Sequence, residues 1–179
     1  MAESPPGPIP LLQRPVVQSL LLQAATHDRE TGCLTAAYLA QRAAEEIARR
    51  QRYGGRLSLL LVAPDEPREA FPDGSSPVVR LAARVRARLR STDLVGRWES
   101  EEIVVLLPGT GLAGASRLAR RILASGPPGS EPGAGAPVLA SIGVATWLGA
   151  AETLGTLIAR ARAGLAEARA RGGGCVGVS

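Results

Sequence analysis

The order of apolar segments along this 179-residue chain predicts one α/β domain, an α+β sandwich in which helices flank a central sheet of about five strands. The prediction depends on two observations. Amphipathic stretches with helical periodicity alternate with short, nearly uninterrupted apolar runs. Hydrophobic residues also make up 45% of the chain, which is enough to form a core in a protein of this length. Aromatic residues are only 3%, so we expect a core of leucine, valine, isoleucine and alanine.

The chain is expected to begin with a disordered lead-in, because residues 1–13 are rich in proline and cannot form a helix. Residues 14–26 then carry the pattern of a short amphipathic helix, and residues 27–179 form the domain. Within the domain, a turn over Asp28–Gly32 leads into a longer amphipathic helix over Thr35–Arg52.

The middle of the chain is predicted to contain a central strand, a helix and a hairpin. Leu57–Ala63 is almost entirely apolar, which indicates a strand covered on both faces. Asp65–Pro77 holds three prolines and is predicted to be a loop, and Val78–Leu89 has the apolar spacing of a helix. Leu94–Trp98 and Ile103–Leu107 flank a short polar turn, as the two strands of a hairpin do.

The C-terminal part continues the alternation of helices and strands. Leu112–Leu123 and Leu154–Arg171 have helical patterns, and Val138–Trp147 is predicted to be a strand. Gly126–Gly135 is a loop of low complexity, and Cys175–Val178 is expected to be a last strand at one edge. This order favours one mostly antiparallel sheet and no second domain.

Charge and composition narrow the classes of function. The net charge is +5 and all 21 basic residues are arginine, so we expect anionic partners. The chain has no basic run with interleaved aromatic residues, the pattern that would indicate nucleic-acid binding. It also has no apolar run long enough to span a membrane. Cys33 and Cys175 lack the spacing of a metal site, and His27 is the one histidine. We therefore expect a cytoplasmic protein without a metal or cofactor of its own.

The predicted hairpin has a distinctive sequence. Arg90 and Asp93 precede its first strand, and its turn reads Glu99-Ser100-Glu101-Glu102-Ile103. This arrangement resembles GGDEF domains, the diguanylate cyclase family, in which R-x-x-D is followed by a strand, the G-G-[DE]-E-F turn and a second strand. Other blocks in the same order are similar to the family's D-x-L-T-G-L opening, its central strand, its S-I-G-V-A strand and its C-terminal helix. These blocks are Asp28–Cys33, Leu57–Ala63, Ala140–Ala145 and Ala161–Val176.

The resemblance implies a degenerate active site. The family's first metal ligand is an aspartate, and this position is Ala63. Glu99 and Ser100 replace the two glycines that let the backbone approach the nucleotide, although Glu101 and Glu102 keep the two acidic positions.

The segments that would bind the nucleotide depart from the family as well. Arg68–Arg80, where the family reads guanine, has no asparagine and offers only Asp73. At the C-terminal end, the lysine and arginine that contact phosphate become Arg169 and Gly173. We therefore expect no catalysis.

The inhibitory site for cyclic di-GMP, in contrast, is expected to be retained. Arg90, Asp93 and Arg121 match the family's three contacts, with Arg117, Arg49 and Arg50 as further candidates, the last two from a second subunit. Arginine offers a planar fork for guanine or phosphate, and an aspartate accepts the guanine N–H donors. The alternative is that Asp93 only caps a turn and the arginines form a solvated surface.

These expectations leave three functions open. The first is an inactive cyclic di-GMP receptor that signals to a protein partner, with a homodimer as one assembly. The second is an interaction scaffold that binds no nucleotide and docks through its N-terminal segment. The third is a weak cyclase in which Glu101 and Glu102 hold a metal.

Overall fold

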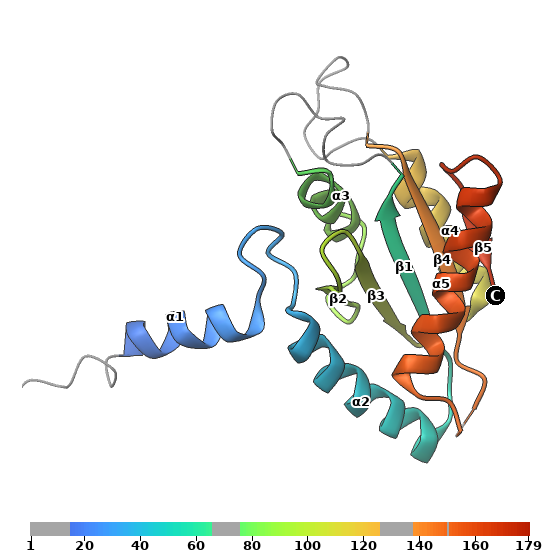
Figure 1. The fold of residues 1–179 in the computed structure, drawn as a ribbon. Helices are drawn as coiled ribbons and strands as arrows, with labels where there is room; N and C mark the ends of the chain where they lie inside the picture. Colours follow the sequence, from blue (N-terminus) through green and yellow to red (C-terminus); the bar gives the residue numbers. More distant parts are fainter. Residues whose placement is uncertain (1–14, 66–75, 126–137, 150) are drawn as a thin grey trace, which may run out of the picture.

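The computed structural model describes residues 15–65, 76–125, 138–149 and 151–179, and these contain five helices, four of which pack on one sheet (Figure 1). The described strands form a five-stranded sheet in the order β2-β3-β1-β4-β5, antiparallel except for the β4–β5 pair, which confirms the predicted sheet. The strands are β1 Leu57–Pro64, β2 Leu94–Arg97, β3 Ile103–Pro108, β4 Ala140–Thr146 and β5 Val176–Val178.

The helices cover both faces of the sheet. On one face, α3 and α4 pack on apolar side chains such as Leu60 and Val105, and on the other α2 and α5 pack on Leu59 and Leu61. The result is the three-layer sandwich that the sequence predicts, and Figure 1 shows α1 projecting away from it. The helices are α1 Pro15–Thr26, α2 Ala36–Tyr53, α3 Pro77–Arg86, α4 Leu112–Ala124 and α5 Leu154–Ala170.

The central position of β1 follows from its sequence. All eight of its residues are buried, because it pairs with β3 on one side and β4 on the other. Leu60, for example, lies opposite Val105 of β3 and Val144 of β4. A strand covered by helices on both faces has no solvent side, which explains why its apolar run is nearly continuous.

Contact between β4 and α5 depends on a glycine. A Cβ atom at Gly143 would lie 1.8 Å from the carbonyl oxygen of Ala161, so only glycine lets the helix lie this close to the strand. The helix itself begins with a reciprocal cap, in which Thr153 and Thr156 exchange backbone-to-side-chain hydrogen bonds. This close packing fixes the face of α5 that points toward the hairpin.

One predicted boundary is wrong. The apolar spacing extends a helix to Leu89, but α3 ends at Arg86. The next residues form a tighter turn, in which the amides of Arg88 and Leu89 donate to carbonyls three residues back. Leu89 still packs against the core, so its apolar character does not mark the helix end. Arg90 therefore lies in a turn beyond the helix.

Several expectations fall outside the described residues: the lead-in over 1–13, most of the loop over 65–77 and the loop over 126–135. In the part of the chain that the structure describes, no helix is both long and apolar enough to cross a membrane.

Candidate functional site

An open cavity of about 240 Å³ lies between the turn that joins α3 to β2, the end of β3 and α4. Four of the predicted ligand residues, Arg90, Asp93, Arg117 and Arg121, line it together. Residues 90 and 93 come from the turn between α3 and β2, whereas 117 and 121 are one helical turn apart on α4. The fold thus brings together residues from two parts of the sequence. The remaining lining residues are Arg88, Leu107, Thr110, Gly114 and Leu118.

The carboxylate of Asp93 has a structural role within this cavity. Its Oδ2 accepts a hydrogen bond of 2.8 Å from the backbone N–H of Arg90, and its own N–H donates to the carbonyl oxygen of Arg90 at 3.1 Å. These two bonds close the turn that presents both side chains. The capping role expected as the alternative is therefore real, and it leaves Oδ1 without a hydrogen-bond partner among the described residues.

The charge of the cavity is strongly positive. Arg121 donates one hydrogen bond to the carbonyl oxygen of Arg88 at 2.9 Å, which ties α4 to the end of α3. Among the described residues, the guanidinium groups of Arg88, Arg90 and Arg117 form neither an ion pair nor a hydrogen bond with another residue. Four arginines thus surround one carboxylate, an arrangement that attracts an anion.

The two candidates from α2 lie elsewhere. Arg49 and Arg50 both pair with Glu46 on the same helix, at 3.7 and 3.4 Å, and neither lines the cavity. Their predicted contribution from a second subunit stays a prediction, because the structure contains one chain.

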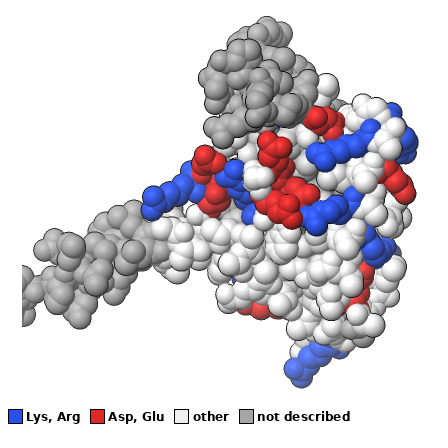
Figure 2. All heavy atoms as spheres, viewed as in Figure 1, with Lys and Arg blue, Asp and Glu red and all other residues white. Residues whose placement is uncertain are grey.

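The turn of the hairpin carries a second cluster of charged residues. Arg162 on α5 reaches across to it, donating from Nη2 to Glu99 at 2.8 Å and from Nε to Glu102 at 3.2 Å. Figure 2 shows acidic side chains gathered over this part of the molecule with basic side chains beside them. The hydrogen bond that Arg162 donates to Glu102 is the largest influence on the pKa of Arg162 and raises it; burial lowers this pKa, but the charge of both glutamates raises it further.

A further ion pair lies just after the end of β1, between Asp65 and Arg169 of α5. Asp65 lies 3.6 Å from the Nε of Arg169 and accepts a 2.8 Å hydrogen bond from the backbone of Gly174. A Cβ at Gly173 would lie 2.8 Å from the Asp65 carboxylate, and its φ of +75° also favours glycine. Ala63 is buried two residues before, in the apolar layer beneath α5.

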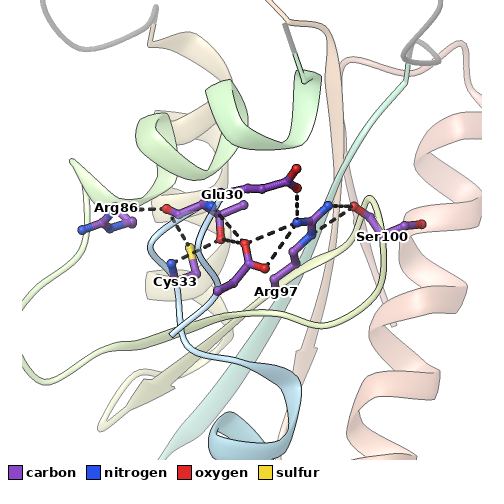
Figure 3. Close-up of polar contacts among 7 residues, drawn as sticks. Glu30, Cys33, Arg86, Arg97 and Ser100 are labelled. Carbon is purple, nitrogen blue, oxygen red and sulfur yellow. Dashed lines mark hydrogen bonds and ion pairs between the residues drawn. The ribbon is translucent and has the colours of Figure 1, made fainter. Parts of the chain in front are cut away.

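The hairpin is joined to the turn that follows α1 through Arg97 (Figure 3). Its Nη1 contacts Asp28 at 3.3 Å and pairs with Glu30, while its Nη2 donates to the carbonyl oxygen of Ser100 at 2.9 Å. Burial would raise the pKa of Asp28, but hydrogen bonds from Thr31 and the charge of Arg97 outweigh it, and the pKa is lowered. This network fixes the position of the hairpin turn.

The sequence profile described as "Diguanylate cyclase, GGDEF domain" matches residues 73–175, more than half of the chain and the part that contains the cavity and the hairpin. The chain belongs to the GGDEF family. The matched region starts four residues before the first residue of α3 and ends one residue before β5. The resemblance of the hairpin is confirmed at the level of the family.

Two curated proteins are similar to more than half of the chain. The diguanylate cyclase DgcP of Pseudomonas aeruginosa is 36% identical over 108 residues, 58% of this chain and 16% of that protein. The response regulator PleD of Caulobacter vibrioides is 32% identical over 163 residues, 84% of this chain and 35% of that protein.

A solved GGDEF structure has the same fold. The diguanylate cyclase SiaD of P. aeruginosa, in complex with its activator SiaC, superimposes with a TM-score of 0.76 at 28% identity, covering 92% of this chain and 65% of that chain. This chain thus spans about a sixth to a third of the curated relatives and under two thirds of this structure.

In this GGDEF chain, the residues at the positions of the motif turn have different surroundings. Glu99 and Glu102 point to Arg162, Ser100 is held through its carbonyl by Arg97, and Ile103 is buried in the sheet as the first residue of β3. No group of three or more His, Cys, Asp or Glu in the described ranges is placed to hold a metal ion. Two of the carboxylates of the turn, those of Glu99 and Glu102, are instead paired with Arg162.

Sequence reasoning missed three residues of this GGDEF site. Arg88 lies two positions before the motif arginine, and only the early end of α3 brings it to the cavity. Arg162 and Arg97 pair with acidic residues more than 60 positions away in sequence. In a chain with 21 arginines, no local pattern distinguishes these three from solvated ones.

Proposed function

We propose that this chain is a GGDEF domain without cyclase activity that binds cyclic di-GMP at the cavity between α3, β2 and α4. The observation that carries the proposal is the composition of this cavity. Arg90, Asp93 and Arg121 converge there with Arg88 and Arg117, and three of the four guanidinium groups are unpaired within the described residues. Such a site offers forks for phosphate and guanine acceptors and one carboxylate for guanine donors.

The size of the cavity limits how the ligand binds. Its volume of about 240 Å³ is below the roughly 300–1,000 Å³ of ordinary small-molecule sites. We therefore propose that it takes only part of the ligand, a guanine edge with an adjoining phosphate. The remainder lies over the exposed side chains of Arg90, Arg117 and Arg121. A second cyclic di-GMP stacked on the first is compatible with this open geometry.

The absence of catalysis is supported by the paired charges at the hairpin. Cyclases lower the barrier with metal ions that neutralise charge on the reacting phosphate. Ala63 supplies no carboxylate, and Glu102 already has Arg162 as its partner. Arg169, the remaining candidate for phosphate, pairs with Asp65. Glu102 and Arg169 are thus neutralised within the chain, whereas Glu101 has no ion pair among the described residues.

The proposed receptor passes its state to a protein partner in the cytoplasm. Calorimetric titration of the purified chain with cyclic di-GMP, and separately with GTP and Mg²⁺, tests this proposal. We expect saturable binding of the dinucleotide and no binding of GTP. Absence of binding at tens of micromolar cyclic di-GMP would support the scaffold instead, and turnover of GTP would support the weak cyclase.

A further inference from the structure

The segment that follows α1, residues 27–35, is hydrogen-bonded to α3 and to β2, the two elements on either side of the turn that contributes to the arginine-lined cavity. On the α3 side, Arg86 donates from Nη1 to the carbonyl oxygen of Thr31 at 3.1 Å. On the β2 side, the N–H of Leu34 donates to Val95 and the N–H of Arg97 donates to Leu34, both at 2.9 Å. We name residues 27–35 the connecting segment.

The connecting segment also anchors α1. The N–H of Thr35 donates to the carbonyl oxygen of Thr26, the last residue of α1, at 2.9 Å, and the Thr35 hydroxyl donates to Ala25 at 3.2 Å. Elsewhere α1 extends from the body (Figure 1), and Leu22 is 66% exposed. The position of α1 thus depends on how firmly the connecting segment is held.

An open cavity separates the end of α1 from the end of α3. It measures about 720 Å³ and is lined by residues such as Gln23 of α1, His27 of the connecting segment and Arg86 of α3. Because α1 is not packed against α3 across this space, a small shift of the connecting segment can reorient the helix without breaking core contacts.

The proposed ligand residues are close in sequence to both anchor points. Arg88 lies two residues after Arg86, and Asp93 lies two residues before Val95. A ligand that contacts both Arg88 and Asp93 links the end of α3 to the start of β2. Both anchors of the connecting segment then become more rigid together.

We propose that ligand binding at the cavity immobilises the connecting segment and with it α1, which makes α1 the element that reports occupancy to a partner. This inference rests on the proposed function. A ligand shifts such an equilibrium only by its difference in affinity for the two states. Here the difference in affinity arises because the ligand can contact Arg88 and Asp93 together only when α3 and β2 have the arrangement that also holds the connecting segment.

Hydrogen exchange of the full chain, with and without saturating cyclic di-GMP, tests this inference, and calorimetry on the same sample measures binding. We expect the amides of residues 19–26 and of Thr35 to exchange on the order of fivefold more slowly with ligand, the lower end of typical coupling between sites. If the ligand binds and these amides are unchanged, the inference is wrong and the receptor proposal stands. If no ligand binds, the receptor proposal fails, and the inference with it.

Arg86→Met isolates the route through α3, because Arg86 donates to Thr31 but does not line the ligand cavity. We expect this variant to bind cyclic di-GMP within about twofold of the unmodified chain while the slowing of α1 exchange is largely lost. Arg120→Met, an exposed arginine of α4 outside the cavity, is the matched control and should keep the full response. An unchanged response in Arg86→Met would rule out the α3 route.

Discussion

The guanidinium of Arg162 on α5 lies 2.8 Å from a carboxylate oxygen of Glu99 in the β2–β3 turn. Glu99 stands where the GGDEF motif has its first glycine. A glycine has no side chain, so it could not form this ion pair. The same guanidinium pairs with Glu102. The hairpin turn and α5 are therefore linked by two ion pairs.

Arg162→Ala should lower the free energy of unfolding by less than about 1 kcal/mol, because Arg162 is 45% exposed and such pairs are screened by water. Urea unfolding at low and high salt measures this change, which should shrink as salt rises. Arg120→Ala is a control for the loss of one surface charge. A loss above roughly 2 kcal/mol that salt does not reduce would mean that the pair is a main support of the hairpin.

Neither the unmodified chain nor Ala63→Asp should make cyclic di-GMP from GTP and Mg²⁺. The substitution restores one carboxylate, but Glu102 stays paired with Arg162, and Arg68–Arg80 has no asparagine for guanine. Because position 63 is buried, the new carboxylate should also cost on the order of 1–3 kcal/mol of stability. Product analysis by chromatography checks the activity. Turnover that disappears in Glu101→Ala or Glu102→Ala would show that the metal site survives.

Asp28 should make stability depend on acidity. Its pKa is lowered in the folded chain, so the unfolded chain takes up the proton first as pH falls. The stabilisation from Asp28 is therefore complete above the unfolded value of about 4 and is lost as pH falls through the folded value. Urea midpoints between about pH 6 and pH 3 should fall less steeply for Asp28→Asn than for the unmodified chain. Parallel curves would contradict the role given to Arg97 and Thr31.

The same series needs a control for the loss of any carboxylate. Glu45→Gln removes the charge of an exposed side chain whose one ion pair within the described residues is with Arg42 on its own helix. Its curve should follow that of the unmodified chain, because surface pairs of this kind contribute less than about 1 kcal/mol.

Gly143→Ala should destabilise the domain by at least about 3 kcal/mol, because its Cβ would overlap the backbone of Ala161 and force α5 away from β4. Gly155→Ala is a matched control within α5, where the nearest atom to a new Cβ is the Thr153 hydroxyl at 3.8 Å. This change should stay within about 1 kcal/mol of the unmodified chain. Thermal unfolding compares the two, and equal stability would contradict the close contact between β4 and α5.

The sheet could be predicted because its central strand has an unambiguous pattern. Leu57–Ala63 is apolar on both faces, and this requires helices on both sides of the sheet. The end of α3 could not be predicted from periodicity, because Leu89 continues the apolar spacing in a tighter turn. Periodicity reports which side chains are buried, not which backbone hydrogen bonds form.

The candidate site could be predicted where a compact motif carries it. Arg90 and Asp93 lie three residues apart, and the family resemblance adds Arg121 on the following helix. Arg88 and Arg162 could not be predicted, because their roles depend on how α3 ends and how closely α5 approaches the hairpin. Tertiary contacts of this kind leave no signal in a single sequence.

The affinity of four variants for cyclic di-GMP, measured by calorimetry at one fixed salt concentration, tests the central claim most directly. A charge-assisted contact contributes roughly 1.5–3 kcal/mol, so Arg90→Ala and Arg121→Ala should each weaken binding at least about tenfold. Asp93→Asn retains an oxygen that can cap Arg90 but presents an NH₂ to a guanine donor, so it should also weaken binding and reduce selectivity for guanine. Arg120→Ala should bind like the unmodified chain. Equal weakening in Arg90→Ala and Arg120→Ala, or no binding by the unmodified chain at tens of micromolar ligand, would contradict the claim.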